Sequence, residues 1–258
     1  MSPRRAMAHA TDKKDRKALP RPAVMVTGGS GGIGRAVCRA FAEAGWFVGV
    51  HYHRGKAAAE ATLEQISAAG GDGALYQADI RDAMAVKHMV EAFCRNHTEV
   101  SAFICNAGIA ETGLILRQPE DAWADVIATN LTGTFHCLRA IGPLFMARGG
   151  GSVVVIGSHA GFHGGMGQGA YAASKAGLIG LVKSAALEWG SGNVRVNLLL
   201  PGWQQTSLSE AAMTRVEGYP DHALRRPPST HEVARTVVHL AQLHDISGQT
   251  WNCDSRHL

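Results

Sequence analysis

The segment Ala23-Val-Met-Val-Thr-Gly-Gly-Ser-Gly-Gly-Ile-Gly34 joins an apolar run to a glycine-rich turn and then to a helical pattern that begins near Ile33. Glycines permit a tight turn and let backbone amides approach a pyrophosphate at the N-terminus of the following helix. This strand–turn–helix context predicts dinucleotide binding. Two alternatives are a plain turn and the G-x-S-x-G elbow of α/β hydrolases, which Gly28 to Gly32 also spell. In hydrolases, however, several strands precede the nucleophile, whereas this turn follows the first strand.

Outward from this segment, apolar β-branched runs alternate with longer amphipathic stretches. We expect strands at 23–27, 46–51, 73–78, 100–105, 151–157, 193–199 and 249–253, and helices at 32–44, 56–69, 82–96, 119–147, 170–189 and 230–243. Strands that are apolar on both faces need helices on both sides. The alternation therefore predicts an α/β fold, a doubly wound parallel sheet of about seven strands, with ligands beyond the carboxyl ends of the strands.

Size and charge bound the class of protein. A chain of 258 residues with 46% hydrophobic and 18% charged residues suits one globular domain, which we expect at 22–258. Residues 1–21 hold seven basic and two acidic side chains, a net charge of +5, so the rest of the chain carries −1 of the total of +4. We expect 1–21 to be a disordered basic leader without the apolar core of a signal peptide; an acidic partner for it stays open. The remaining body gives no electrostatic support for nucleic-acid binding.

The sequence contains no run of eighteen apolar residues, so we expect no membrane span. Its five cysteines are odd in number and scattered, without a CxxC pair, which indicates a reducing, cytoplasmic location. The thirteen histidines show no HExxH spacing, and we expect no metal site.

A second group of residues carries chemistry in the C-terminal half. Ser158 ends an apolar run, and Tyr171 and Lys175 follow in a helical stretch, four residues apart and therefore on one helix face. An ammonium about 4 Å away favours phenolate by roughly 4 kcal/mol at an effective dielectric constant of about 20. That corresponds to about three units below the ordinary tyrosine pKa near 10. We therefore expect Lys175 to lower the pKa of Tyr171 and to make it a proton donor and acceptor at neutral pH.

The end of the second strand predicts the cofactor. An acidic residue there would bind the ribose hydroxyl of NAD, whereas a basic residue accommodates the 2′-phosphate of NADP. The sequence reads His51-Tyr-His53-Arg54, with no carboxylate before Glu60. This favours NADP(H), the alternative being that Arg54 is an ordinary surface cation.

Polar residues follow the next two strands and interrupt the longest helix. Asp79-Ile80 and Asn106-Ala107-Gly108 would face the adenine half of a dinucleotide, although each is also an ordinary turn former. Asn130 lies within the helical pattern 119–147, where its side chain competes with helical hydrogen bonds. It marks either a kink or a buried polar group that holds a water near Lys175.

Together these motifs resemble the short-chain dehydrogenase/reductase family, from about Ala23 to Asp254. The motifs are Thr27-Gly-x-x-x-Gly-Ile-Gly34, Asn106-Ala-Gly108, Asn130, Ser158, Tyr171-x-x-x-Lys175 and Pro201-Gly202. Within the family the chain is most similar to the β-ketoacyl-acyl-carrier-protein reductases. The resemblance implies a single-domain Rossmann-type fold and reduction of a carbonyl by hydride transfer, most simply of a 3-oxoacyl thioester on acyl-carrier protein or coenzyme A. It also implies a homotetramer.

The resemblance assigns roles to individual residues. Ser158 would hydrogen-bond the substrate carbonyl, Tyr171 would transfer the proton, Lys175 would bind the nicotinamide ribose, and Asn130 would complete a water-linked relay. The implied NADP(H) contacts are Thr27, Gly28, Ser30, Gly32, Ile33, Gly34, His53, Arg54, Asp79, Ile80, Asn106, Ala107, Gly108, Tyr171, Lys175, Pro201, Gly202 and Thr206.

The chain also departs from these reductases. Gly31 replaces an arginine that commonly meets the 2′-phosphate, so the NADP preference rests on His53 and Arg54. Trp251-Asn-Cys-Asp-Ser-Arg-His257 replaces the usual Asp-Gly-Gly ending, and Trp203, Met213 and Tyr219 are candidates to cover an apolar pocket. Two alternatives remain for function: a dehydrogenase of a small ketone, sugar, steroid or secondary alcohol, and a dinucleotide-binding sensor without catalysis.

Overall fold

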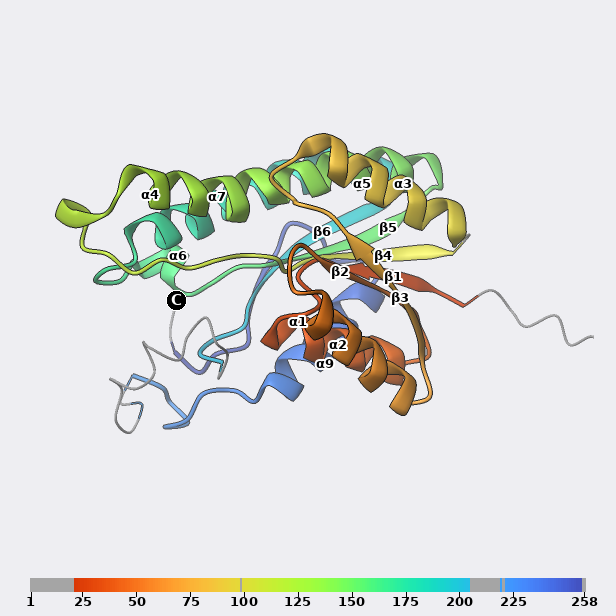
Figure 1. The fold of residues 1–258 in the computed structure, drawn as a ribbon, viewed down its shortest axis with the longest axis horizontal. Helices are drawn as coiled ribbons and strands as arrows, with labels where there is room; N and C mark the ends of the chain where they lie inside the picture. Colours follow the sequence, from red (N-terminus) through yellow and green to blue (C-terminus); the bar gives the residue numbers. More distant parts are fainter. Residues whose placement is uncertain (1–20, 98, 205–218, 220, 257–258) are drawn as a thin grey trace, which may run out of the picture.

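The computed structural model describes residues 21–97, 99–204, 219 and 221–256, and these form helices packed on both faces of one sheet (Figure 1). The strands are β1 (Ala23–Val26), β2 (Phe47–Tyr52), β3 (Asp72–Gln77), β4 (Val100–Cys105), β5 (Gly151–Ile156), β6 (Val194–Leu200) and β7 (Thr250–Asn252). The helices are α1 (Gly32–Glu43), α2 (Lys56–Ala68), α3 (Ala83–Asn96), α4 (Glu120–Ile127), α5 (Gly133–Ala147), α6 (Ala160–His163), α7 (Gly169–Trp189) and α9 (Thr230–Gln242).

All seven strands are parallel and lie in the order β3-β2-β1-β4-β5-β6-β7. The chain winds outward from β1 to β3, then crosses to β4 on the other side of β1 and winds toward β7. Neighbouring β1 and β4 therefore have their following loops on opposite sides of the sheet. In doubly wound sheets this switch point opens a crevice at the carboxyl ends of the strands.

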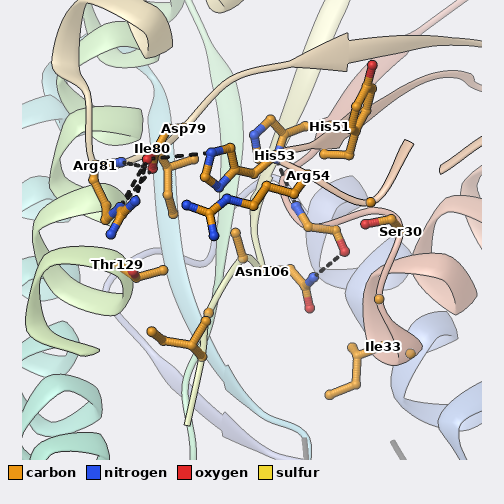
Figure 2. A pocket seen from close by; sticks show the side chains of 18 of the residues that line it. Ser30, Ile33, His51, His53, Arg54, Asp79, Ile80, Arg81, Asn106 and Thr129 are labelled. Atoms are coloured by element: carbon orange, nitrogen blue, oxygen red, sulfur yellow. Dashed lines mark hydrogen bonds and ion pairs between the residues drawn. The ribbon is translucent and has the colours of Figure 1, made fainter. Parts of the chain in front are cut away.

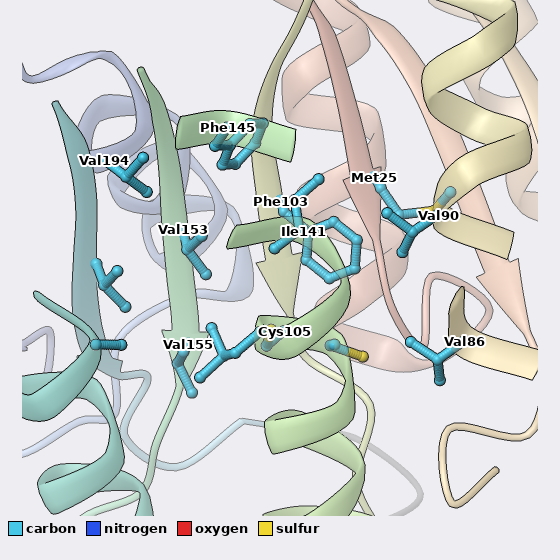
Figure 3. Close-up of a cluster of buried hydrophobic side chains, with 14 of the residues drawn as sticks. Met25, Val86, Val90, Phe103, Cys105, Ile141, Phe145, Val153, Val155 and Val194 are labelled. Atoms are coloured by element: carbon cyan, nitrogen blue, oxygen red, sulfur yellow. The ribbon is translucent and has the colours of Figure 1, made fainter. Parts of the chain in front are cut away.

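Two apolar cores cover the two faces of the sheet. Helices α3, α5 and α7 pack on one face, where Phe103, Val153 and Phe145 are fully buried (Figures 1 and 3). Helices α1, α2 and α9 pack on the other face, against alternate strand residues such as Val24 and Val154. Because both faces are covered, inner strands such as β1 and the segment Val153–Ile156 of β5 are continuously apolar, which is the pattern that the sequence predicted, whereas the edge strands β3 and β7 are more polar.

The predicted fold class is confirmed, and each expected strand and helix is present to within a few residues. The main difference lies in the helix expected at 119–147, which comprises α4, a π-helical turn η2 (Ala128–Thr132) and α5. The interruption centres on Asn130, as the sequence suggested. The short helix α6 and two 3₁₀ turns, η1 (Ile115–Arg117) and η3 (Gly190–Gly192), were not predicted, because such short elements carry no periodic signal.

The expected leader lies outside the described residues except for Arg21, so its boundary stays a prediction. Within the described ranges, no helix combines the length and the apolar character needed to cross a bilayer. Those same residues also bring together no group of three or more His, Cys, Asp or Glu side chains placed to hold a metal ion.

Candidate active site

The glycine-rich turn is tied to the neighbouring strands by hydrogen bonds. The Thr27 hydroxyl donates to the carbonyl of Ile104 and accepts from the backbone N–H of Asn106, so it joins the ends of β1 and β4. An ideal Cβ at Gly34 would lie 2.1 Å from the Gly28 carbonyl oxygen. Only a glycine therefore allows α1 to begin this close to the turn. The first N–H groups of α1 have no side-chain cap at Gly31, which leaves them open to an anion.

His51 holds this turn from the side of β2, a role that the sequence analysis missed. Its Nδ1 accepts a hydrogen bond from the Gly28 N–H at 3.0 Å, and its Nε2 lies 3.1 Å from the Ala78 carbonyl oxygen. A ring that accepts at Nδ1 and donates at Nε2 is neutral. Burial lowers the pKa of His51 to about 4, which agrees with a neutral ring at physiological pH.

Charged side chains gather at the ends of β2 and β3. The Arg81 guanidinium donates to the Asp79 carboxylate at 2.8 Å, and His53 Nε2 lies 3.6 Å from Asp79 (Figure 2). Arg81 also donates to Asp125 at 3.0 Å. The hydrogen bonds from Arg81 lower the pKa of Asp79 to about 2. Arg54 is exposed and lines the same cavity as these groups (Figure 2). Because Arg81 pairs with both carboxylates of this group, Arg54 is the cation at this end of the cavity for which the described residues provide no ion-pair partner.

Ser158, Tyr171 and Lys175 converge beyond the carboxyl end of β5. Ser158 follows β5, whereas Tyr171 and Lys175 lie on consecutive turns of α7. The Tyr171 phenol interacts with the Ser158 hydroxyl. Lys175 Nζ lies 5.7 Å from the centre of the Tyr171 ring and donates to the carbonyl of Ile156 at 2.8 Å. The predicted grouping of these three side chains is therefore present.

The expected direction of the Tyr171 pKa is wrong for this structure. Burial raises the pKa of Tyr171 above its ordinary value, and the hydrogen bond with Ser158 offsets only part of this. Lys175 Nζ lies 5.7 Å from the centre of the Tyr171 ring, and burial lowers the pKa of Lys175 itself to about 8. The spacing in the sequence correctly predicted that Tyr171 and Lys175 share one helix face. It could not predict how deeply the two side chains are buried, and burial is what shifts both pKa values.

Asn130 is fully buried in the turn η2, and its side chain holds this turn to the backbone of Ile109 and to α7. Its Oδ1 accepts from the Ile109 N–H at 2.8 Å, and its Nδ2 donates to the Ile109 carbonyl at 2.9 Å and to Ser174 Oγ at 3.0 Å. An ideal Cβ at Gly108 would lie 3.1 Å from Asn130 Oδ1 and 3.8 Å from Lys175 Nζ. Asn130 and Lys175 therefore both lie close to Gly108.

Two cavities meet at Tyr171. The larger, about 550 Å³, runs from the glycine-rich turn past Arg54 and Asp79 to Lys175. The smaller, about 250 Å³, is lined by Ser158, Gly202 and Arg256 among others. Tyr171 and Ile33 line both cavities, so Tyr171 can contact a molecule bound in either cavity.

Most of the expected site residues lie in these cavities. The larger is lined by Gly28, Ser30, Gly32, Ile33, His53, Arg54, Asp79, Ile80, Asn106, Ala107, Gly108, Tyr171 and Lys175. Thr27, Gly34 and Asn130 do not line either cavity but contact residues that do. Pro201 is buried after β6, and Thr206 lies outside the described residues. Arg81, Asp125 and Thr129 also line the larger cavity and were missed, because they come from α4, η2 and a loop without a motif.

The comparisons with known proteins agree with this architecture. The family model described as short chain dehydrogenase matches residues 22–216. A 3-oxoacyl-[acyl-carrier-protein] reductase FabG of Staphylococcus aureus is 36% identical over 233 residues, covering 88% of this chain and 94% of the relative. A 3-oxoacyl-[acyl-carrier-protein] reductase of Synechocystis is 36% identical over 242 residues, covering 92% and 97%.

The parallel sheet with a glycine-rich turn at its switch point defines an α/β dinucleotide-binding protein. The chain belongs to the short-chain dehydrogenase family. It is therefore an oxidoreductase, and the family implies a nicotinamide dinucleotide cofactor.

Proposed function

We propose that the protein reduces a 3-oxoacyl thioester to the 3-hydroxyacyl thioester with NADPH. The observation that carries this proposal is the position of Tyr171 at the junction of the two cavities, with Ser158 and Lys175 beside it. The similarity to 3-oxoacyl-[acyl-carrier-protein] reductases over most of the chain supports the choice of substrate.

Each residue has a physical role in this reaction. A reduced nicotinamide bound in the larger cavity would supply the hydride for the carbonyl carbon. Ser158 would donate a hydrogen bond to the carbonyl oxygen, and Tyr171 would give that oxygen its proton. With a pKa of about 8, Lys175 is mostly protonated at pH 7, and its charge would stabilise the phenolate that remains. Asn130 would position the backbone of Ile109 and, through Ser174, the start of α7.

The larger cavity fits a dinucleotide. The uncapped N-terminus of α1 and the turn that only Gly34 permits would hold the pyrophosphate. Arg54 and His53 would hold the 2′-phosphate of NADP, because guanidinium groups bind phosphate with strong hydrogen bonds.

The NADP preference predicts the behaviour of one variant. Arg54→Gln removes the exposed cation, so the KM for NADPH should rise about tenfold or more while the KM for NADH stays nearly unchanged. Steady-state kinetics with both cofactors measures this, with Arg39→Gln on the outer face of α1 as the control. Equal changes for both cofactors would contradict the assignment.

A substrate panel tests the reaction itself. We expect NADPH-dependent reduction of 3-oxoacyl thioesters on acyl-carrier protein or coenzyme A, with lower kcat/KM for free ketones, sugars and steroids. Better rates on free ketones would favour the second candidate, a dehydrogenase of small carbonyl compounds, without changing the catalytic residues. NADPH binding without turnover of any carbonyl would instead indicate a non-catalytic sensor.

We also infer a cytoplasmic homotetramer. The five cysteines are all free, which suits a reducing compartment. Helices α5 and α7 leave Phe135 and Leu187 exposed, and a second copy of the chain would cover them. Light scattering coupled to gel filtration measures the oligomeric state, and a monomer would refute the assembly.

A further inference from the structure

The smaller cavity contains a cation that the proposed reaction does not use. Arg256 lines it together with Ser158 and Tyr171, and its side chain is 15% exposed. Arg256 belongs to the C-terminal segment 251–257, which differs from the Asp-Gly-Gly ending of the reductases that the chain resembles. The resemblance therefore assigns no role to Arg256. Burying a guanidinium costs free energy unless it is paired.

Neighbouring groups hold the Arg256 guanidinium in place. Its Nε donates to Asp254 Oδ2 at 2.7 Å, Nη2 donates to the same oxygen, and the group lies 5.7 Å from the centre of the Trp203 ring. The Asp254 side chain has no exposed surface, and its other oxygen lies 3.1 Å from His222 Nε2. Arg256 therefore lines the cavity, whereas its ion-pair partner Asp254 does not.

The remaining donors of Arg256 suit an anion. A guanidinium carries five N–H groups in a planar fork, and Nε and one group of Nη2 suffice for the contacts with Asp254. The described residues supply no hydrogen-bond acceptor for Nη1. The ion pair with Asp254 and the contact with Trp203 hold the Arg256 guanidinium in one orientation in the free protein. Less side-chain entropy is then lost when an anion binds.

We propose that Arg256 binds a carboxylate on the acyl part of the substrate, so that the preferred substrate is a short 3-oxoacyl thioester whose acyl chain ends in a carboxylate. This inference rests on the proposed function. A cavity of about 250 Å³ lies below the roughly 300–1,000 Å³ of sites for drug-sized ligands, and so suits a short chain. Gln168 and His159 add polar groups beside the cation, and Ile33, Ala110 and Trp203 give apolar surface for a short acyl chain.

The test compares two substrates of equal chain length. They are the N-acetylcysteamine thioester of 3-oxohexanedioic acid, with a free carboxylate, and the methyl ester of that compound. We expect kcat/KM of the full-length protein to be about tenfold or more higher for the free carboxylate, as one strong charge-assisted contact provides. In Arg256→Gln this ratio should fall to near one. Arg256→Lys keeps a point charge without the fork and should keep part of the ratio.

Arg235→Gln is the matched control, because Arg235 is an exposed arginine on α9 and should keep the wild-type ratio. Equal kcat/KM of the wild-type protein for the two thioesters would overturn the inference, whether or not Arg256→Gln folds. So would an unchanged ratio in Arg256→Gln.

A binding measurement separates this inference from the proposed reaction. Glutarate is titrated into the NADPH-loaded protein by calorimetry. If neither thioester is reduced but glutarate binds to the wild-type protein and not to Arg256→Gln, the anion site stands and the reaction is wrong. If both thioesters are reduced equally well and glutarate does not bind, the reaction stands and the anion site is refuted.

Discussion

The imidazole of His51 joins two backbone groups that come from different parts of the chain. It accepts from Gly28 in the glycine-rich turn and lies against the Ala78 carbonyl beyond β3. A proton on Nδ1 would point at the Gly28 N–H, and the hydrogen bond would be lost. The geometry of the cofactor turn therefore depends on the protonation state of one buried ring.

This arrangement predicts a pH dependence of stability. The pKa of His51 is lowered from 6.5 to about 4, so the unfolded chain binds more protons between these values and stability falls as pH decreases from 6.5 toward 4. The shift corresponds to about 3 kcal/mol. Denaturant unfolding of the wild-type protein and of His51→Asn at pH 7, 5.5 and 4.5 isolates this contribution, because other groups titrate alike in both. Parallel pH profiles would show that His51 contributes nothing.

The glycine-rich turn gives a second prediction at this scale. Gly34→Ala places a methyl group 2.1 Å from the Gly28 carbonyl oxygen, so the turn must open and NADPH affinity should fall about tenfold or more. Gly31→Ala is the matched control in the same turn, since its nearest atom would be 3.5 Å away. Fluorescence titration with NADPH compares them. Equal affinities would mean that the close approach is not required.

At the scale of elements, the interruption between α4 and α5 is stabilised by one side chain. Asn130 satisfies both backbone groups of Ile109 and also reaches Ser174 on α7. A π-helical turn gives up regular helical hydrogen bonds, and such turns frequently occur at functional sites. Here it connects the loop after β4 to the helix that carries Tyr171 and Lys175.

Asn130→Ala should therefore lower the free energy of unfolding. It leaves the N–H and the carbonyl of Ile109 without partners, at about 1–3 kcal/mol for each unsatisfied group. Thr134→Val removes one hydrogen bond to the carbonyl of Asn130 and should cost only about 1 kcal/mol. Denaturant unfolding ranks the two variants. The interpretation fails if Asn130→Ala costs no more than Thr134→Val.

Local patterns predicted the elements well, because strands buried on both faces are continuously apolar and the helices are amphipathic. The glycine turn followed from its strand–turn–helix context and the pairing of Tyr171 with Lys175 from helical spacing, whereas the role of Ser158 followed from the resemblance to the family. The contacts of Arg81 with Asp79 and Asp125 did not, since they join loops and helices distant in sequence. The Tyr171 pKa was predicted in the wrong direction because burial is a tertiary property.

At the scale of the whole molecule, the described residues bring both cavities to the carboxyl ends of the strands. The surplus positive charge of the sequence lies in residues 1–21, and the described residues that line the cavities come after Pro22. Residues 1–21 therefore carry the basic character of the chain, and the described part of the site lies in the domain that follows them.

A variant that lacks residues 1–20 should consequently keep its fold and activity. We expect its free energy of unfolding to change by no more than about 0.5 kcal/mol, as for surface changes, and its kcat/KM to stay within about twofold. Chemical denaturation and NADPH oxidation measure both. A large loss of either would show that the segment belongs to the domain.

The most direct test of the account is the Tyr171→Phe variant, assayed with NADPH and a 3-oxoacyl thioester. Loss of the phenol proton should lower kcat by about 10²–10⁴-fold, while the dissociation constant for NADPH stays close to that of the wild-type protein. Tyr76→Phe, which alters a tyrosine on β3 outside both cavities, should leave kcat unchanged. Turnover by Tyr171→Phe at the wild-type rate would contradict the proposed chemistry.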